Sequence, residues 1–343
     1  MSSTEHDHHT AHAADNQPAI QVEALVKNFS DVHAVRGIDF SVSEGEMFGF
    51  LGPNGAGKST TIKILCTLAD PTSGGARVAG YDVVTQRALV RRSIGLVFQE
   101  PTLDLYLTGD QNLSFHGELY GVPRAALKPR IDAVLEMVGL ADRRGDKVQT
   151  YSGGMKRRLE IGRGLLHSPR VLFLDEPTIG LDPQTRSSIW RYIAQLQERE
   201  EITIFMTTHY MDEAEFCDRI AIMDQGRIVA LDTPEALKAQ VGADRVRIQT
   251  EDDGAAIAAI AERFGIEAQI AEGAVTFFVA GGEQFVPRLF AELGVPIKSV
   301  SVSRPTLDDV FMSYTGSTIR DAEESGNKHA NRVMMQMMSG SRR

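Results

Sequence analysis

A glycine-rich segment that ends in lysine and serine is the part of the sequence with the most evident chemistry. It reads GPNGAGKSTT over residues 52–61, between the strand-like MFGFL and the helix-like STTIKILCTL. Glycines let backbone N–H groups approach phosphate oxygens, and the N-terminus of the following helix adds positive charge. Lys58 would reach the outer phosphates and Ser59 would ligate magnesium. The segment predicts a nucleotide site formed by Gly52, Pro53, Asn54, Gly55, Ala56, Gly57, Lys58, Ser59 and Thr60.

Two adjacent carboxylates end an apolar run further along the chain. The run is VLFLDEP, residues 171–177. Asp175 would hold magnesium, directly or through water, and Glu176 would face the attacking water as general base or orienting acceptor. The two roles differ because neighbouring strand residues point in opposite directions. A solvated turn is the alternative for an isolated Asp-Glu pair, but so apolar a strand favours the site at a strand end.

A second glycine-rich segment, YSGGMKRRLE, occupies residues 151–160. Ser152 can cap the amphipathic helix that follows, while the amides of Gly153 and Gly154 face outward as a second anion site. Taken alone, these residues favour a capped helix with a tight turn over an anion site. The two glycine-rich segments each begin a different helix, and this geometry argues against both binding the same phosphates within one chain. A head-to-tail pair of chains would resolve this, with each cradle closing over the partner's nucleotide.

The elements that must position these residues alternate between apolar runs and helical patterns, as in a parallel sheet covered by helices. The runs expected to be buried strands are IGLVF (94–98), VLFLD (171–175), TIFMTT (203–208) and RIAIMD (219–224). After about residue 243 the order becomes strand, helix, two strands, helix and strand. The segments in that order are RVRIQT, GAAIAAIAERFG, EAQIA, AVTFFVA, EQFVPRLFAELG and KSVSVS. This order predicts a second, small α+β domain of ferredoxin-like type over residues 241–316.

Composition narrows the class of protein. The chain has 343 residues, enough for a full core, and a formal net charge of −10, which argues against general binding of nucleic acid. Its two cysteines, Cys66 and Cys217, indicate a reducing compartment rather than a disulfide framework. The start has no apolar signal region and no apolar run approaches 18 residues, so we expect a cytoplasmic protein. Residues 1–18, with four histidines, and residues 317–343, with MMQMM, read as tails.

Six motifs in this order resemble the ATP-binding subunit of an ABC transporter over residues 20–240. They are GPNGAGKST as Walker A, Gln99 in VFQEP as the Q-loop, YSGGM as the signature, VLFLDEP as Walker B, GLD at 180–182 as the D-loop and His209 in TTH as the switch histidine. The resemblance implies a P-loop NTPase fold over residues 19–240, with a helical subdomain at about 99–165. It also implies that Ser152, Gly153 and Gly154 bind the γ-phosphate of ATP held by the opposite protomer.

The resemblance assigns roles to four further residues. Phe29 would stack on adenine, Gln99 would touch magnesium or the attacking water, and His209 would contact the γ-phosphate and support Glu176. Asp182 would shape the dimer interface. Each has a plainer alternative, namely a core aromatic, a surface glutamine, a histidine at a strand end and an aspartate in a turn or helix cap.

Two departures from the usual signature sequence of the family point to one group of ABC transporter ATPases. Tyr151 replaces the usual Leu and Met155 the usual Gln. With LVFQEPTLDLYLTGDQNL (96–113) and TLDDVFMSYTG (306–316), these variants resemble the daunorubicin-resistance-type (ABC-2 class) exporter ATPases through the second domain. That likeness implies hydrolysis of ATP with Mg²⁺ by a homodimer at the cytoplasmic face of a bacterial-type membrane. It would power export of a drug, lipid or other amphiphile through a separate integral membrane permease. The alternatives are a soluble ABC ATPase not coupled to transport and a non-hydrolysing binding module.

Overall fold

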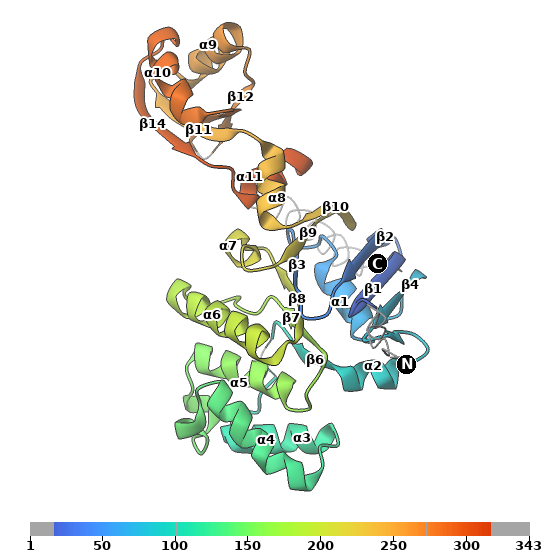
Figure 1. Cartoon of the computed structure of the whole chain (residues 1–343). Helices are drawn as coiled ribbons and strands as arrows, with labels where there is room; N and C mark the ends of the chain where they lie inside the picture. The colour runs from blue at the N-terminus through green and yellow to red at the C-terminus, as the bar shows by residue number, and fades with distance from the viewer. Residues whose placement is uncertain (1–16, 101, 272, 317–343) are drawn as a thin grey trace, which may run out of the picture. The chain divides into compact units, whose positions relative to one another are not determined.

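The computed structural model describes residues 17–100, 102–271 and 273–316 (Figure 1). The histidines at the start and the MMQMM segment lie outside the described residues, as do the predicted tails except for Gln17 and Pro18. The chain divides into two compact units, residues 1–46 with 59–205 and residues 47–58 with 206–343.

The predicted buried strands belong to a sheet with the order β10-β9-β3-β8-β7-β6. Its strands are β3 (Met47–Leu51), β6 (Ile94–Val97), β7 (Val171–Asp175), β8 (Thr203–Thr208), β9 (Arg219–Asp224) and β10 (Arg227–Asp232). Strand β3 runs parallel to β9 and β6 runs parallel to β7, while β10 pairs antiparallel with β9. Every residue of β3, β7 and β8 is buried, as expected for parallel strands covered on both faces. The boundary between the two units runs through β8, after Phe205.

The first unit also holds an antiparallel sheet that the sequence did not predict. Its order is β2-β1-β4-β5, from β1 (Ile20–Phe29), β2 (Val32–Val42), β4 (Ser73–Val78) and β5 (Tyr81–Asp82). The pairing of β1 with β2 shifts register at several points, and Ala24 has a positive φ of 44°. Such bulges break the alternation of apolar and polar residues that marks a half-buried strand.

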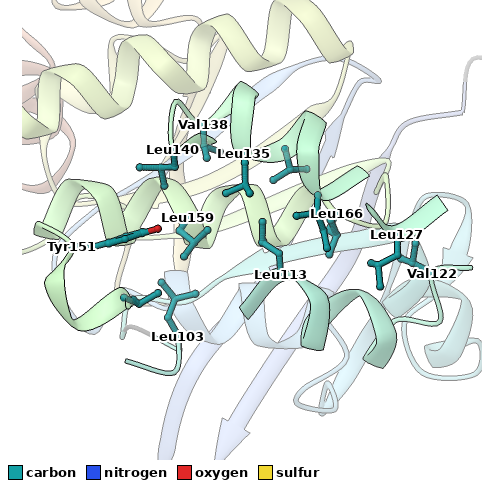
Figure 2. Close-up of a cluster of buried hydrophobic side chains, with 13 residues drawn as sticks. Leu103, Leu113, Val122, Leu127, Leu135, Val138, Leu140, Tyr151, Leu159 and Leu166 are labelled. Atoms are coloured by element: carbon teal, nitrogen blue, oxygen red, sulfur yellow. The ribbon is translucent and has the colours of Figure 1, made fainter. Parts of the chain in front are cut away.

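Three helices of the first unit form a layer with its own core. They are α3 (Gly109–Leu119), α4 (Arg124–Met137) and α5 (Gly153–Leu165), and two short 3₁₀ turns at Ala141–Arg143 and Val148–Thr150 lie between α4 and α5. Figure 2 shows apolar side chains such as Leu113, Leu135 and Leu159 pointing toward one another between these helices. Tyr151, the departure from the usual Leu, is buried in this core, and its hydroxyl donates to the carbonyl oxygen of Arg143 at 2.7 Å.

Five further helices follow or connect the strands of these sheets. They are α1 (Lys58–Leu65), α2 (Arg87–Ser93), α6 (Pro183–Glu200), α7 (Met211–Ala214) and α8 (Pro234–Val241).

The C-terminal part has the ferredoxin-like order that the sequence predicts. Its elements are β11 (Asp244–Thr250), α9 (Asp253–Phe264), β12 (Ala268–Ala271), β13 (Ala274–Val279), α10 (Gly282–Glu292), β14 (Ile297–Ser303) and α11 (Leu307–Thr315). The sheet order is β12-β13-β11-β14, with every neighbouring pair antiparallel. Helices α9 and α10 cover one face (Figure 1), where Ile260 and Leu289 pack on Val246, Ile248 and Phe277.

Helix α11 packs on α8, so the chain returns to the helix that precedes the ferredoxin-like sheet. The hydroxyl of Tyr314 donates to Oε1 of Gln240 at 2.8 Å. On the sheet side, Nη1 of Arg245 lies 3.1 Å from Oδ1 of Asp309, whose side chain is fully buried. Thr306 donates to the other oxygen of this carboxylate through its backbone N–H and its hydroxyl. Residues 306–316 are therefore a structural part of this domain.

Candidate nucleotide-binding site

The glycine-rich loop leaves β3 at Leu51 and enters α1 at Lys58, as the sequence predicts. Nζ of the buried Lys58 donates to the carbonyl oxygens of Gly52, at 2.6 Å, and Pro53, at 3.1 Å. The N–H of Gly52 donates to the carbonyl oxygen of Thr208 at 3.3 Å, which ties the loop to the end of β8. The loop is therefore curled around the ammonium group, with a helix N-terminus directly after it.

Gly52 is required by a close approach of two backbones. A Cβ atom at this position would lie 2.2 Å from the carbonyl oxygen of Met223 in β9. Gly55 and Gly57 have φ angles of 84° and 109°, which residues with a side chain rarely adopt. The glycine pattern thus specifies the backbone path that a phosphate-binding loop needs.

Two oxygen-bearing side chains meet where α1 begins and β7 ends. Oγ of Ser59 donates to Oδ1 of Asp175 at 3.1 Å, and the carboxylate is 7% exposed. A hydroxyl and one carboxylate fit Mg²⁺, which prefers oxygen ligands and takes the rest from water and phosphates. The described residues contain no group of three or more His, Cys, Asp or Glu side chains that could hold a metal ion.

Glu176 follows β7 in an unusual backbone conformation. Its φ is 45°, in the left-handed region that costs a residue with a side chain about 1–2 kcal/mol. The residue is 6% exposed, and its carbonyl oxygen accepts from the N–H of Ile179 at 3.3 Å. The chain therefore turns at the carboxylate that the sequence predicts to face the attacking water, as general base or orienting acceptor.

The signature segment begins α5. Oγ of Ser152 accepts from the N–H of Met155 at 3.3 Å, so Ser152 is the N-cap that the sequence predicts. Gly153 and Gly154 form the first turn and lie close to the D-loop segment. A Cβ at Gly153 would lie 3.2 Å from Leu181, and one at Gly154 would lie 2.7 Å from Cγ2 of Thr185. The signature segment therefore packs directly against the D-loop and the start of α6 of the same chain.

Asp182 is the N-cap of α6, which agrees with the plainer interpretation of this residue as an aspartate in a turn or helix cap. Its Oδ1 accepts from the N–H of Thr185 at 3.0 Å. Hydrogen bonds from Thr185 hold the pKa of Asp182 below its usual value. The carboxylate is therefore a charged cap at a helix N-terminus, where negative charge is favourable.

Phe29 and Gln99 both have exposed side chains. Phe29 ends β1 and is 49% exposed, with Nζ of Lys27 4.7 Å from its ring centroid, so the alternative of a core aromatic is wrong. Gln99 lies two residues after β6, and its side chain makes no hydrogen bond within the described part of the chain. The structure does not join Gln99 to Ser59 or Asp175.

His209 lies directly after β8. Its ring packs against Tyr210, with centroids 4.0 Å apart. The preceding hydroxyl, Oγ1 of Thr208, donates to Oε2 of Glu213 at 2.5 Å, which fixes the end of the strand. His209 therefore begins the loop at the carboxyl end of a central strand, as Glu176 does after β7.

Sequence reasoning missed a buried ion pair on α5. Arg157 and Glu160 are 6% and 2% exposed, with Nη1 and Oε2 3.0 Å apart. Both lie in the run MKRRLE, whose charges resemble a solvated helix face. The three-residue spacing of opposite charges was the available signal, since such residues are neighbours on a helix.

Sequence reasoning also missed a groove of about 820 Å³ in the first unit. Exposed apolar side chains line it, namely Leu68, Phe98 and Leu119, and Arg91, Arg92 and Arg163 give it positive charge. Burial and the charges of Arg163 and His167 lower the pKa of His116, another lining residue, to about 4. The groove is thus lined by both apolar and basic side chains.

Comparisons with known proteins agree with this geometry. The family model "ABC transporter" matches residues 35–179, and the model "ATP-binding protein DrrA1-3-like, C-terminal domain" matches residues 233–315, which include α8. The linearmycin resistance ATP-binding protein LnrL of Bacillus subtilis is 41% identical over 88% of this chain and 100% of its own length. The daunorubicin/doxorubicin resistance ATP-binding protein DrrA of Streptomyces peucetius is 39% identical over 88% of this chain and 94% of its own.

Solved structures show the same cassette. CbiO1 of Clostridium perfringens, part of the ABC transporter complex cbiONQ, has a TM-score of 0.61 and 32% identity over 65% of this chain and 91% of its own. A dimeric cassette, MJ0796 bound to ADP and Pi, has a TM-score of 0.56 and 26% identity over 62% of this chain and 98% of its own. Among the described residues no helix is both long enough and apolar enough to cross a membrane. The chain belongs to the ATP-binding proteins of ABC transporters, in the group of the drug-resistance ATPases, and its activity is ATP hydrolysis.

Proposed function

We propose that this chain works as a head-to-tail homodimer at the cytoplasmic face of the membrane and powers export through a separate integral membrane permease. The observation that carries the proposal is the hydrogen bond of Ser59 with Asp175, next to the turn that presents Glu176. It supports a hydrolytic site, and so an energy source rather than a passive binding module.

The residues of the first site would divide the work of hydrolysis. Lys58 and the amides of residues 52–60 would bind the phosphates, and Phe29 would stack on the adenine. Ser59 and Asp175 would hold Mg²⁺, with Gln99 as a further oxygen donor; the ion would neutralise charge on the phosphates. Glu176 would accept the proton of the attacking water, and His209 would contact the γ-phosphate.

The second copy would complete each site. Ser152, Gly153 and Gly154 begin α5, where amides and the helix dipole favour an anion. In the same chain these glycines pack on Leu181 and Thr185, so the signature is supported by its own D-loop. Asp182 would hold that D-loop in place at the dimer interface. We propose that the segment closes over the γ-phosphate held by the partner chain.

The groove would receive the permease. Its lining exposes Leu68, Phe98 and Leu119, which suits an amphipathic helix, and its arginines suit acidic residues beside that helix. Phe98 precedes Gln99, so the groove borders the segment that would respond to nucleotide. The helical layer, proposed at about 99–165 within a nucleotide-binding domain over residues 19–240, supplies several of the lining residues, among them His116, Leu119 and Arg163.

The cargo is proposed from the names of relatives. Linearmycin and daunorubicin resistance proteins are similar over most of the chain. We infer a cargo of the same broad kind, a drug, lipid or other amphiphile. The domain at 241–316 would stabilise or regulate the dimer. Nucleic acid is not a proposed partner, given the net charge of −10.

The experiment is copurification of the tagged full-length chain from its native membranes in mild detergent with Mg-ATP, followed by mass identification. We expect a stoichiometric polytopic membrane protein. Leu119→Asp in the groove should release it, whereas Ile270→Asp, on the C-terminal domain and similarly exposed (60% against 68%), should not. Recovery of only a soluble homodimer, or of ribosomes or DNA, would favour a soluble ABC ATPase instead.

A further inference from the structure

Arg157 in α5 contacts two segments that belong to other parts of the fold. Its Nη1 donates to the carbonyl oxygen of Phe98 at 2.7 Å, and its Nε donates to that of Pro177. Nη2 also reaches the carbonyl oxygen of Glu176 at 3.5 Å. One side chain therefore joins the signature helix, the residue before Gln99 and the two residues that end Walker B.

Glu160 extends this network toward the groove. One carboxylate oxygen pairs with Arg157, and the other accepts from the N–H of Thr102 at 2.8 Å. Arg163 then donates to the carbonyl oxygen of Thr102 at 3.0 Å and to its hydroxyl. Both ends of the segment from Phe98 to Thr102 are thereby fixed to α5.

The position of these contacts matters because Glu176 has a left-handed backbone. Such a conformation persists only where the surroundings determine it. A guanidinium group suits this task, because its planar donors hold two carbonyl groups in one fixed geometry, which an ammonium group cannot do. The N–H of Ile179 donates to the carbonyl oxygen of Glu176, whereas the carbonyl oxygen of Pro177 accepts from Arg157.

We propose that Arg157 is a positioning residue for hydrolysis. It fixes the backbone of Glu176 and the start of the Q-loop relative to the signature helix, so that the Glu176 carboxylate meets the attacking water. Glu160 balances its charge and holds it in place. The inference rests on the proposed role of Glu176 as general base.

A purely structural role is the competing explanation. Removing one partner of a buried ion pair leaves an uncompensated charge and destabilises a protein, whereas replacing both partners is often tolerated. The test therefore needs one variant that keeps the charge and one that removes both charges.

The first variant is Arg157→Lys, which keeps the pairing with Glu160 and loses the planar fork. We expect kcat for ATP hydrolysis to fall roughly tenfold to hundredfold, since small misplacements of reacting groups cost that much. KM for ATP should stay unchanged, because Lys58 and Ser59 are untouched. Arg158→Gln is the matched control: Arg158 lies on the same helix and donates to the carbonyl oxygen of Val138 at 2.9 Å, within the helical layer. It should keep the kcat of the wild type.

The second variant is Arg157→Met combined with Glu160→Gln, which removes both charges of this buried pair. This variant should be folded, with a cooperative thermal unfolding transition, and should show the same loss of kcat as Arg157→Lys. Hydrogen exchange gives an independent readout: in Arg157→Lys, peptides covering residues 98–104 and 176–182 should exchange faster, and peptides from the 52–60 loop should not.

Wild-type kcat in both variants would overturn the inference. An equal loss in Arg158→Gln, or a rise in KM with unchanged kcat, would overturn it too. Glu176→Gln separates this result from the proposed function. If that variant is inactive while both Arg157 variants are normal, only the role of Arg157 fails. If it keeps full activity, the general-base assignment itself fails.

Discussion

The hydroxyl of Ser59 donates to the carboxylate of Asp175 across 3.1 Å, although 116 positions separate the two residues. Ser59 belongs to α1, the helix that follows the glycine-rich loop. Asp175 is the last residue of β7, a strand that is buried at every residue. The contact places the hydroxyl in the first turn of α1 beside a carboxylate suited to magnesium.

This contact predicts a specific dependence on magnesium. Ser59→Ala should weaken activation by Mg²⁺ about tenfold or more, because the proposed ligand and the partner of Asp175 are lost together. Ser59→Thr keeps the hydroxyl and should behave like the wild type. The measurement is ATPase rate against Mg²⁺ concentration at fixed ATP. Equal Mg²⁺ curves for Ser59→Ala and the wild type would remove Ser59 from the metal site.

Gly95 should be intolerant of a side chain. A Cβ at this position of β6 would lie 2.3 Å from the carbonyl oxygen of Gly164 in α5, and neither backbone can give way without shifting an element. Gly95→Ala should lower the free energy of unfolding by about 1–3 kcal/mol. Gly145→Ala, where no atom lies within 4 Å of the added Cβ, should change it little. Urea denaturation checks both, and equal midpoints would show that helix and strand are not held this closely.

The groove histidine predicts a loss of stability in acid. An unfolded histidine takes up a proton near pH 6.5, whereas His116 in the folded chain does so only at about pH 4. The unfolded state therefore binds more protons between these values, so stability falls as the pH drops from about 6.5 toward 4 and is unaffected above.

Urea midpoints at pH 7.5 and pH 5 test this account. The wild type should lose more stability between the two than His116→Gln does. The pKa of His167 is also lowered, chiefly by burial, and its share of the loss stays in both proteins. Identical losses would show that His116 is protonated as readily in the folded chain as in the unfolded one.

Sequence patterns predicted the elements that are uniform along their length. β7 and β8 are buried at every residue, and the strand and helix order after residue 243 is regular, so both the central strands and the ferredoxin-like domain were predictable. The N-terminal antiparallel sheet was not, because register shifts in β1 break the alternation of apolar and polar residues. The sequence pattern therefore predicted these strands but not the strand β1, whose alternation several register shifts interrupt.

Part of the candidate site could be predicted from the sequence and part could not. Ser59 and Asp175 stand in motifs whose spacing indicates their role, and they meet in the structure. The left-handed backbone of Glu176 and the partners of Arg157 depend on contacts between distant segments, which no local pattern encodes. The amphipathic pattern after Ser152 did not indicate that the charged side chains of Arg157 and Glu160 are buried.

The most direct test of the account is the nucleotide-dependent behaviour of Glu176→Gln. The variant keeps the binding loop and Asp175, and it lacks only the group that would take the proton of water. We predict that it binds Mg-ATP, runs as a dimer in ATP and as a monomer in ADP, and has almost no turnover. Full ATPase activity in this variant, or a monomer in saturating Mg-ATP, would contradict the account of a dimer that closes over ATP and opens by hydrolysis at Glu176.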